Sequence, residues 1–254
     1  MKVFNKLLIL SVLILIQNCG DKQPEFTIYT IGDSTMADKN PGVYPETGWC
    51  QVLGDFFNDA VTISNHAVNG RSSKSFIDEK RWQAVHDSLK PGDFVFIQFG
   101  HNDEKEYDTT RYTTPFGTYS ENLKKFILET REKGARPVLF TSIARRKFGE
   151  NGKLTKTHGD YPEATRVVAK DLNVPLIDLE KLTEDLINTL GDEPSKEFFL
   201  WTDPDEKFPD GRKDDTHLSE KGAREVAKLT LKEAIVQKLE FSKRVTLADK
   251  YSEK

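Results

Sequence analysis

The chain has 254 residues, of which 37% are hydrophobic and 31% are charged, and its formal net charge is −4. These proportions are typical of a water-soluble globular protein, and the length fits one α/β domain or two small ones. Binding to a phosphate backbone needs a basic face, so the mildly acidic balance argues against nucleic acid as a partner.

The N-terminal segment resembles an export signal. "MKVFNK" is short and basic, "LLILSVLILI" is an apolar run, and "QNCGDK" follows. The run is short for a bilayer span but has the length and flanks of a signal-peptide core. We therefore expect residues 1–18 to be a signal peptide and the protein to be exported. Cys19 resembles the lipidated cysteine of bacterial lipoproteins, which predicts a lipidated tether at 19–25 and a place in the cell envelope. Asn18 departs from the small residue usual before that cysteine, and simple cleavage with secretion is the alternative.

Five short apolar segments have the composition of buried strands. They are rich in Val, Ile and Phe and are bounded by Gly, Pro, Asp or Asn. These segments are residues 26–31, 61–68, 94–99, 137–142 and 174–179. Helical patterns occupy residues 48–57, 80–89, 119–134, 161–172 and 219–239. This alternation predicts a parallel five-stranded sheet with helices on both faces. We place the folded domain at residues 26–241 and a C-terminal tail at 242–254.

Polar residues follow the ends of the first three predicted strands. Gly32-Asp33-Ser34 comes directly after the first strand, "NHAVNGRSS" closes the second, and "QFGHND" closes the third. A fourth cluster, "DDTHLSEKG", directly precedes the last predicted helix. In open parallel sheets, ligands bind outside the carboxyl ends of the strands. We therefore expect the chemistry of this protein at that edge of the sheet.

Ser34 allows two interpretations. Gly-Asp-Ser between a strand and a helix is good turn and N-cap chemistry, because short oxygen-bearing side chains accept hydrogen bonds from the first helical turn. The alternative is a nucleophile. Asp214 lies three residues before His217, close enough for the carboxylate to reach the imidazole and orient it as a general base for a serine hydroxyl.

Acyl transfer by a serine also needs hydrogen-bond donors for the oxyanion of the tetrahedral intermediate. Ser34, at an expected helix start, offers its own backbone N–H. Gly70 lets the backbone approach a ligand closely, and Asn102 offers a side-chain amide. Three donors of this kind would complete an oxyanion hole.

Together, the four blocks resemble those of the SGNH (GDSL-type) hydrolases. Gly32-Asp33-Ser34, Gly70, "GHND" at 100–103 and Asp214-x-x-His217 occur in the order of that family and span nearly the whole chain after the signal segment. The fuller strings "TIGDST", "NGRSSKSF", "QFGHND" and "DDTHLSEKGA" are most similar to the rhamnogalacturonan acetylesterases, carbohydrate esterase family 12. The resemblance implies a flavodoxin-like three-layer α/β/α fold with no metal or organic cofactor.

The resemblance also implies a role for each matching residue. Ser34 is the nucleophile, His217 the general base and Asp214 its orienting acid. Gly70 and Asn102 are oxyanion donors together with the Ser34 N–H. The reaction implied is acyl transfer through an acetyl-enzyme.

Other polar residues near these blocks have simpler interpretations. Asp215 is an alternative triad acid, but the spacing in the family favours Asp214. We expect His101 and Asp103 to brace the loop after the third strand. The acidic stretch "DPDEKFPDGRKDD" lacks the D-x-[DN]-x-[DN]-G pattern of a calcium loop, so we expect a solvated loop and no metal.

Five basic residues follow strand ends on the predicted active edge, although the whole chain is acidic. Their ordinary interpretation is as solvated surface charges. Converging beside Ser34, they would instead receive galacturonate carboxylates, which Arg binds in bidentate fashion. These residues are Arg71, Lys74, Arg145, Arg146 and His158.

The sequence thus predicts an exported serine esterase that removes acetyl groups from a pectin backbone, rhamnogalacturonan I. Its expected partner is an acetylated acidic polysaccharide, with membrane contact only through a lipid on Cys19. Within the enzyme class, the alternative is an esterase for another acetylated carbohydrate such as xylan, or for lipid esters. The alternative of another class is a catalytically inactive, glycan-binding surface lipoprotein.

Overall fold

The computed structural model describes residues 25–246. Its strands are β1 (Phe26–Gly32), β2 (Val61–Asn65), β3 (Phe94–Gln98), β4 (Arg136–Phe140), β5 (Leu176–Ile177), β6 (Phe199–Thr202) and β7 (Arg212–Leu218). Its α-helices are α1 (Ser73–Asp78), α2 (Arg81–Ser88), α3 (Ser120–Glu132), α4 (Tyr161–Asp171), α5 (Leu179–Leu190), α6 (Asp192–Ser195) and α7 (Glu220–Val236). Short helical turns are η1 (Pro41–Val43), η2 (Leu53–Phe56), η3 (Pro115–Tyr119), η4 (Lys196–Phe198) and η5 (Glu240–Arg244).

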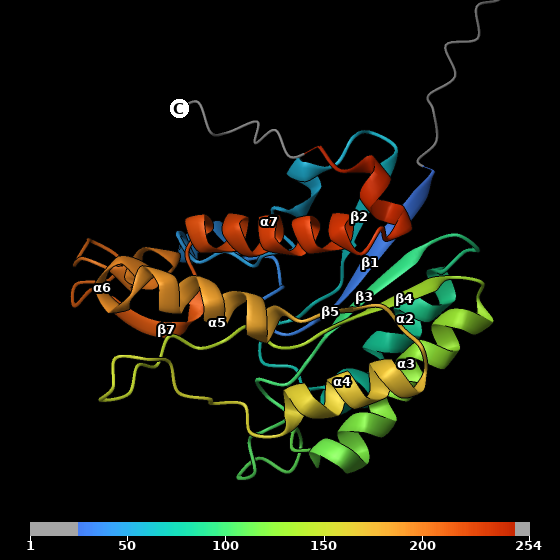
Figure 1. Ribbon diagram of the computed structural model, residues 1–254, viewed down its shortest axis with the longest axis horizontal. Coiled ribbons are helices and arrows are strands. Elements are labelled where there is room, and N and C mark those ends of the chain that lie inside the picture. The colour runs from blue at the N-terminus through green and yellow to red at the C-terminus, as the bar shows by residue number, and fades with distance from the viewer. Residues whose placement is uncertain (1–24, 247–254) are drawn as a thin grey trace, which may run out of the picture.

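The main sheet has five parallel strands in the order β2-β1-β3-β4-β5. Helices α5 and α7 lie over one face of this sheet, and α2, α3 and α4 lie over the other (Figure 1). The predicted three-layer α/β/α fold with a central parallel five-stranded sheet is confirmed. β6 and β7 form a separate antiparallel hairpin outside the main sheet.

The central strand shows why two helical layers are needed. All five residues of β3, "FVFIQ", are buried. Side chains alternate across a strand, so Phe94 and Phe96 pack on the side of α5 and α7 while Val95 and Ile97 pack on the side of α1 to α4. A strand that is apolar on both faces needs cover on both faces, which is what a parallel sheet with crossover helices provides.

The register of the sheet brings the predicted polar clusters together. Gly32 of β1 is paired with Gln98 of β3, and Gln98 is paired with Phe140 of β4. All three residues end their strands, so the segments that follow them emerge side by side. The carboxyl edge of the sheet is therefore where the Gly32-Asp33-Ser34 turn meets the loop that carries Asn102.

Several sequence predictions are corrected by the structure. Residues 48–57 do not form an α-helix; only the short turn η2 occurs there. A Cβ on Gly48 would lie 2.1 Å from the carbonyl oxygen of Ala37, so this stretch is pressed against the turn after β1. β2, β4 and β5 end two or three residues earlier than expected, β5 because α5 begins at Leu179. The fold also continues past residue 241, since Val245 pairs with Phe57.

Several elements were not predicted. They are α1, α5, α6 and the β6–β7 hairpin. The predicted signal peptide and Cys19 lie outside the described residues. Between residues 25 and 246, no helix is both long and apolar enough to cross a lipid bilayer.

Candidate active site

Ser34 lies on a single tight turn after β1. The Asp33 carbonyl accepts hydrogen bonds from the backbone N–H groups of Met36 and Ala37, at 3.2 and 3.1 Å, but no helix follows. The expectation that Ser34 starts a helix is therefore wrong. Asp33 and Thr35 are buried on either side of it, with 0% and 1% exposure, whereas Ser34 itself is partly exposed. The turn thus presents one hydroxyl to solvent from a buried backbone.

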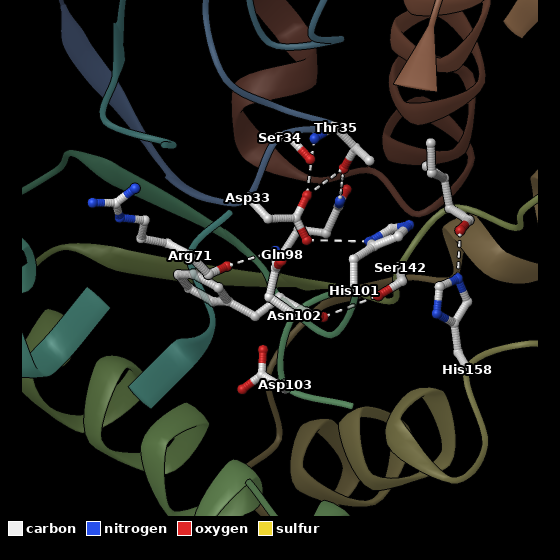
Figure 2. A network of polar contacts seen from close by, with 12 residues as sticks. Asp33, Ser34, Thr35, Arg71, Gln98, His101, Asn102, Asp103, Ser142 and His158 are labelled. Carbon is white, nitrogen blue, oxygen red and sulfur yellow. Dashed lines mark hydrogen bonds and ion pairs between the residues drawn. The ribbon is translucent and has the colours of Figure 1, made fainter. Parts of the chain in front are cut away.

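A buried polar network holds this turn. Figure 2 shows the Asp33 carboxylate between Thr35 and the His101 ring. The carboxylate accepts hydrogen bonds from Thr35 N and Oγ1, at 2.9 and 2.8 Å, and lies 3.1 Å from His101 Nδ1. Gln98 donates to Thr35 Oγ1 at 2.6 Å, and Trp49 donates to Gln98 at 2.9 Å. All of these side chains are buried, so the network fixes the orientation of the turn from the interior of the protein.

The charges in this network are well defined. Burial opposes ionisation of Asp33, but His101 and the hydrogen bonds from Thr35 outweigh it and lower the pKa of Asp33 to about 2. Burial lowers the pKa of His101 to about 4 against the attraction of Asp33. At neutral pH, His101 is therefore uncharged and donates through Nδ1 to an anionic Asp33. In this tautomer Nε2 carries no proton, and it has no hydrogen-bond partner among residues 25–246.

A bulge in β7 brings Asp214 and His217 together. Phe199 of β6 pairs with Leu218 and Leu200 pairs with Asp214, so residues 215–217 bulge out between two consecutive residues of β6. In a regular strand, side chains three apart point to opposite faces. The bulge removes that alternation. Asp214 Oδ1 accepts from the backbone N–H groups of Thr216 and His217, at 2.7 and 2.9 Å, which stabilises the bulge.

Ser34, His217 and Asp214 form one continuous hydrogen-bonded chain. Ser34 Oγ lies 3.0 Å from His217 Nε2, and His217 Nδ1 lies 2.7 Å from Asp214 Oδ2. Partial burial opposes ionisation of Asp214, but the hydrogen bonds and charge of His217 lower its pKa to about 2. The ionised carboxylate holds the imidazole proton on Nδ1 and leaves Nε2 free to accept the serine proton. This is the geometry of a nucleophile, a general base and an orienting acid.

Three residues predicted to form an oxyanion hole, Ser34, Gly70 and Asn102, have N–H groups available for a ligand. Within residues 25–246, neither the Ser34 nor the Gly70 backbone N–H is engaged in a hydrogen bond. Gly70 has φ +75°, a conformation that L side chains rarely adopt. Asn102 is 3% exposed, and its Nδ2 donates to the carbonyl oxygen of Arg71 at 3.1 Å. These three residues offer donors for a negatively charged oxygen beside Ser34.

The loop that carries Asn102 is anchored at both ends. Gly100 has φ +143°, and a Cβ there would lie 2.3 Å from Ser142 Oγ, so only glycine fits. Asp103 accepts hydrogen bonds from Ser73 N and Oγ and from Thr113 Oγ1, at 2.5 to 3.1 Å. Asp103 thus ties the loop to the start of α1, the bracing role expected from the sequence. Burial raises the pKa of Asp103 to about 7 despite these bonds.

Comparison with known proteins identifies the family. Residues 28–230 match the model of the GDSL-like lipases/acylhydrolases. The chain belongs to this family. It is a carboxylic ester hydrolase, and it is 47% identical over 204 residues to the rhamnogalacturonan acetylesterase RhgT of Bacillus subtilis (strain 168), with 80% of this chain and 86% of that one covered. A rhamnogalacturonan acetylesterase of Emericella nidulans is 30% identical over 247 residues, with 88% and 90% covered.

Solved structures share the fold of this GDSL-like hydrolase. The protein YxiM of Bacillus subtilis matches with a TM-score of 0.73 at 25% identity, over 86% of this chain and 58% of that one. Axe2, an acetylxylan esterase from Geobacillus stearothermophilus, matches with a TM-score of 0.61 at 18% identity, over 83% and 94%. At that identity, the likeness to Axe2 shows the fold alone.

The five predicted cationic residues do not form one cluster in this hydrolase. Arg146, instead of facing a substrate, is 4% exposed. Its guanidinium binds Asp215 at 2.6 Å, Ser195 Oγ at 3.1 Å and the side chain of Asp192, and it lies 5.0 Å from the ring of Trp201. No face of this guanidinium is left for a substrate carboxylate. The interaction also gives Asp215 a structural role, separate from that of Asp214.

The other cations divide into two groups. Arg71 and Lys74 line a cleft of about 680 Å³ that begins at Gly70. Arg145 pairs with Glu104 instead, and His158, only 1% exposed, lies 3.1 Å from the same carboxylate. This second group packs behind the His101 ring, which contacts His158 at a centroid distance of 4.5 Å. His158 also lines a second cleft, of about 660 Å³, so the first group is distinguished by lining the cleft that includes Gly70.

Two residues near Asn102 were missed by the sequence analysis. Lys105 Nζ donates to Asn102 Oδ1 at 2.9 Å, and Arg111 Nη1 lies 3.5 Å from the same oxygen. Nothing in their sequence positions distinguishes them from other surface cations, except that Lys105 follows "GHND" closely. Across residues 25–246, no group of three or more His, Cys, Asp or Glu side chains is placed to hold a metal ion.

The contrast between Asp214 and Asp215 makes a direct test of the acid assignment. Asp214→Asn should lower kcat about 10³–10⁴-fold, because an amide no longer holds the His217 proton on Nδ1. Asp215→Asn, the matched control, should retain most of its kcat and lower the thermal unfolding midpoint, because Arg146 loses a charged partner. Steady-state hydrolysis of p-nitrophenyl acetate and thermal unfolding measure the two effects. An equal loss of kcat in both folded variants would contradict the assignment to Asp214.

Proposed function

We propose that this protein is an exported serine esterase that removes acetyl groups from a pectin backbone, rhamnogalacturonan I. The observation that carries the proposal is the chain from Ser34 through His217 to Asp214, next to unengaged donors on Ser34 and Gly70. The substrate assignment is supported by the 47% identity to RhgT over most of both chains.

In the proposed acylation step, Ser34 Oγ attacks the acetyl carbonyl carbon while His217 Nε2 accepts the serine proton. The carbonyl oxygen becomes an oxyanion that receives hydrogen bonds from Ser34 N, Gly70 N and Asn102 Nδ2. Collapse of the intermediate breaks the bond to the sugar oxygen, which takes the proton from His217 and leaves. Asp214 stays ionised and stabilises the imidazolium throughout.

In the proposed deacylation step, a water molecule takes the place of the sugar hydroxyl. His217 accepts a proton from the water as its oxygen attacks the acetyl group on Ser34. The second tetrahedral intermediate uses the same donors. Its collapse releases acetate and returns the proton to Ser34 Oγ.

We propose that the cleft at Gly70 receives part of the acidic polysaccharide. Arg71 and Lys74 line it, as does Arg111, which the sequence analysis did not include. Asp78, Glu79 and Asp108 also line the cleft, and Glu79 accepts hydrogen bonds from Arg71 at 3.1 to 3.2 Å. A substrate carboxylate therefore competes with this exposed ion pair, which costs little to break. Arg145 and His158 act in this proposal only through Glu104.

A lipid ester is less well supported as the substrate. The clefts of about 680 and 660 Å³ on the two sides of residues 104–111 are lined mainly by charged and polar residues, and an acyl chain needs an apolar site. Xylan has no carboxylate on its backbone sugars. Whether the protein prefers acetylated xylan is one of the outcomes that the glycan panel below distinguishes.

Acetate release from a panel of acetylated glycans tests the proposed function. Wild-type protein should release more acetate from acetylated rhamnogalacturonan than from acetylated xylan or mannan. Ser34→Ala should abolish release and leave the thermal midpoint nearly unchanged, because a small, partly exposed hydroxyl contributes little to the core. Folded wild-type protein that turns over neither p-nitrophenyl acetate nor any glycan would instead favour the glycan-binding lipoprotein.

The proposed preference for acidic glycans has its own test. The double variant Arg71→Ala with Lys74→Ala should raise KM for acetylated rhamnogalacturonan several-fold, since each exposed charge contact is worth at most about 1 kcal/mol. Turnover of p-nitrophenyl acetate, which has no carboxylate, should change much less. Rising salt should weaken the wild-type preference, because it screens charges beyond about 8–10 Å.

The matched control for this test is Lys170→Ala with Lys232→Ala. Both lysines are exposed, on α4 and α7, and their loss changes the net charge by the same amount. The control should leave KM for the polysaccharide unchanged. Equal rises in KM for the two double variants would show that net charge, and not the cleft, sets the preference.

We also propose that the protein is a cell-envelope lipoprotein anchored through Cys19, on the strength of "LLILSVLILIQNCGD". Cys19→Ser should move the exported protein from the membrane fraction to the soluble fraction, because it removes the thiol that carries the lipid. Fractionation with mass spectrometry of the mature N-terminus measures this. Wild-type protein found soluble after export, with an ordinary cleaved N-terminus, contradicts the anchor.

A further inference from the structure

Asn102 is the proposed oxyanion donor whose orientation depends on a side-chain torsion. The other two donors are backbone N–H groups, which the chain itself fixes. A side-chain amide has two ends of nearly equal shape, one with two donors and one with only acceptors. It serves an oxyanion only when its nitrogen faces the reacting carbonyl. The structure must therefore contain something that distinguishes the two ends of the Asn102 amide.

Lys105 makes that distinction. Its Nζ lies 2.9 Å from Asn102 Oδ1, and an ammonium group donates hydrogen bonds but cannot accept them. Only the oxygen end of the amide can face it. On the other side of the amide, the carbonyl oxygen of Arg71 accepts from Nδ2 at 3.1 Å and can face only the nitrogen end. The two contacts together allow one orientation of the amide and exclude the flipped one.

The amide keeps one donor available in that orientation. Nδ2 carries two hydrogens, and among the described residues its only acceptor is the Arg71 carbonyl oxygen. The second hydrogen is free for a ligand. A positive charge on the oxygen end also draws electrons away from the nitrogen, which strengthens both N–H donors. Arg111 Nη1, 3.5 Å from Oδ1 and 3.5 Å from the Gly70 carbonyl oxygen, adds to the same positive field.

We propose that Lys105 is a positioning residue for the esterase reaction, which holds the Asn102 amide with its nitrogen toward the oxyanion and polarises it. The inference rests on the proposed function of Ser34 and Asn102. Lys105 also lines the cleft of about 660 Å³ on the far side of residues 104–111 from Gly70, next to the exposed ring of Tyr107. A role in binding the glycan there is the competing explanation, and the choice of substrate separates the two.

The first experiment uses p-nitrophenyl acetate, which has no glycan portion for the clefts to bind. Lys105→Met keeps an unbranched side chain of four heavy atoms and removes the terminal ammonium donor. Its kcat should fall about 10-fold with KM nearly unchanged, a part of the ~10²–10³-fold that an oxyanion donor contributes. Lys105→Arg, which keeps a charged donor, should recover most of kcat. Lys170→Met, an exposed lysine on α4, is the matched control and should equal wild type.

The second experiment is a double-mutant cycle with Asn102→Ala, which alone should lower kcat by ~10²–10³-fold. Because Lys105 acts through the amide, Lys105→Met should cost less than two-fold more in the Asn102→Ala background. The same 10-fold loss in both backgrounds overturns the proposal, as does a wild-type kcat for Lys105→Met. A change confined to KM for the acetylated polysaccharide also overturns it and makes Lys105 a glycan-binding residue.

A folding measurement and a second variant distinguish a loss of positioning from a loss of folding. Thermal unfolding shows whether each variant is folded, and Lys105→Gln, which is polar, replaces Lys105→Met if the latter is not. Lys105→Gln should also lose kcat, because its amide is uncharged and offers either of its ends to Asn102. Wild-type protein inactive on every ester defeats the proposed function, whereas active wild-type protein with an unaffected Lys105→Met defeats only this inference.

Discussion

The site depends on a buried cation that joins two parts of the fold. His217 and Asp214 lie on the β6–β7 hairpin, which shares no strand with the main sheet, whereas Ser34 follows β1 of that sheet. Arg146 follows β4 and connects the two, because its guanidinium binds Asp215 and its backbone N–H donates to the Asp215 carbonyl oxygen at 2.8 Å. Arg146 is 4% exposed but Asp215 is 40% exposed, so solvent partly screens the ion pair, and the backbone hydrogen bond supports the same link. Arg146 thus holds the hairpin that carries His217 against the main sheet, and its backbone bond to Asp215 does not depend on the side chain at that position.

Much of this arrangement was predictable because topology requires it. Short apolar runs bounded by turn residues gave the five strands of the sheet, and β3 differs from its prediction by one residue (94–98 instead of 94–99). In a parallel sheet, all carboxyl ends meet at one edge, so Ser34 and Asn102 were expected there without knowledge of any contact. Asp214 and His217 were expected to meet because of their spacing along the chain, and not because of the sheet topology. The sequence indicated that they could meet, but not that a bulge in a strand allows it.

The remaining features could not be predicted from the sequence because they depend on tertiary contacts. "RKDDTHL" has neither an apolar run nor a clean alternation, since β7 pairs on one side only and bulges in the middle. Arg146 has the sequence context of a surface cation, and its burial follows from Asp192 and Asp215, which are distant in sequence. The pattern at Trp49, Leu53 and Phe56 has a helical period and these side chains are fully buried, yet the close approach of Gly48 to Ala37 replaces the helix with turns.

The electrostatics of the site follow from how two buried carboxyl groups are partnered. Asp33 and Asp103 are both fully buried near Ser34, but the pKa of Asp33 is about 2 and that of Asp103 about 7. Interactions with His101 and Thr35 lower the pKa of Asp33. At Asp103, desolvation outweighs the hydrogen bonds, and the nearby charge of Asp33 raises the pKa of Asp103 further. Asp33 holds the Ser34 turn and is anionic at neutral pH, whereas Asp103, a much weaker acid, holds the Asn102 loop. Negative charge near the serine opposes formation of an oxyanion, whereas positive charge favours it. Lys105 and Arg111 supply positive charge at the oxygen end of the Asn102 amide. In the proposed reaction, these two cations supply the positive potential for the oxyanion, while the anionic Asp33 lies on the buried side of the turn and is bound by Thr35 and His101.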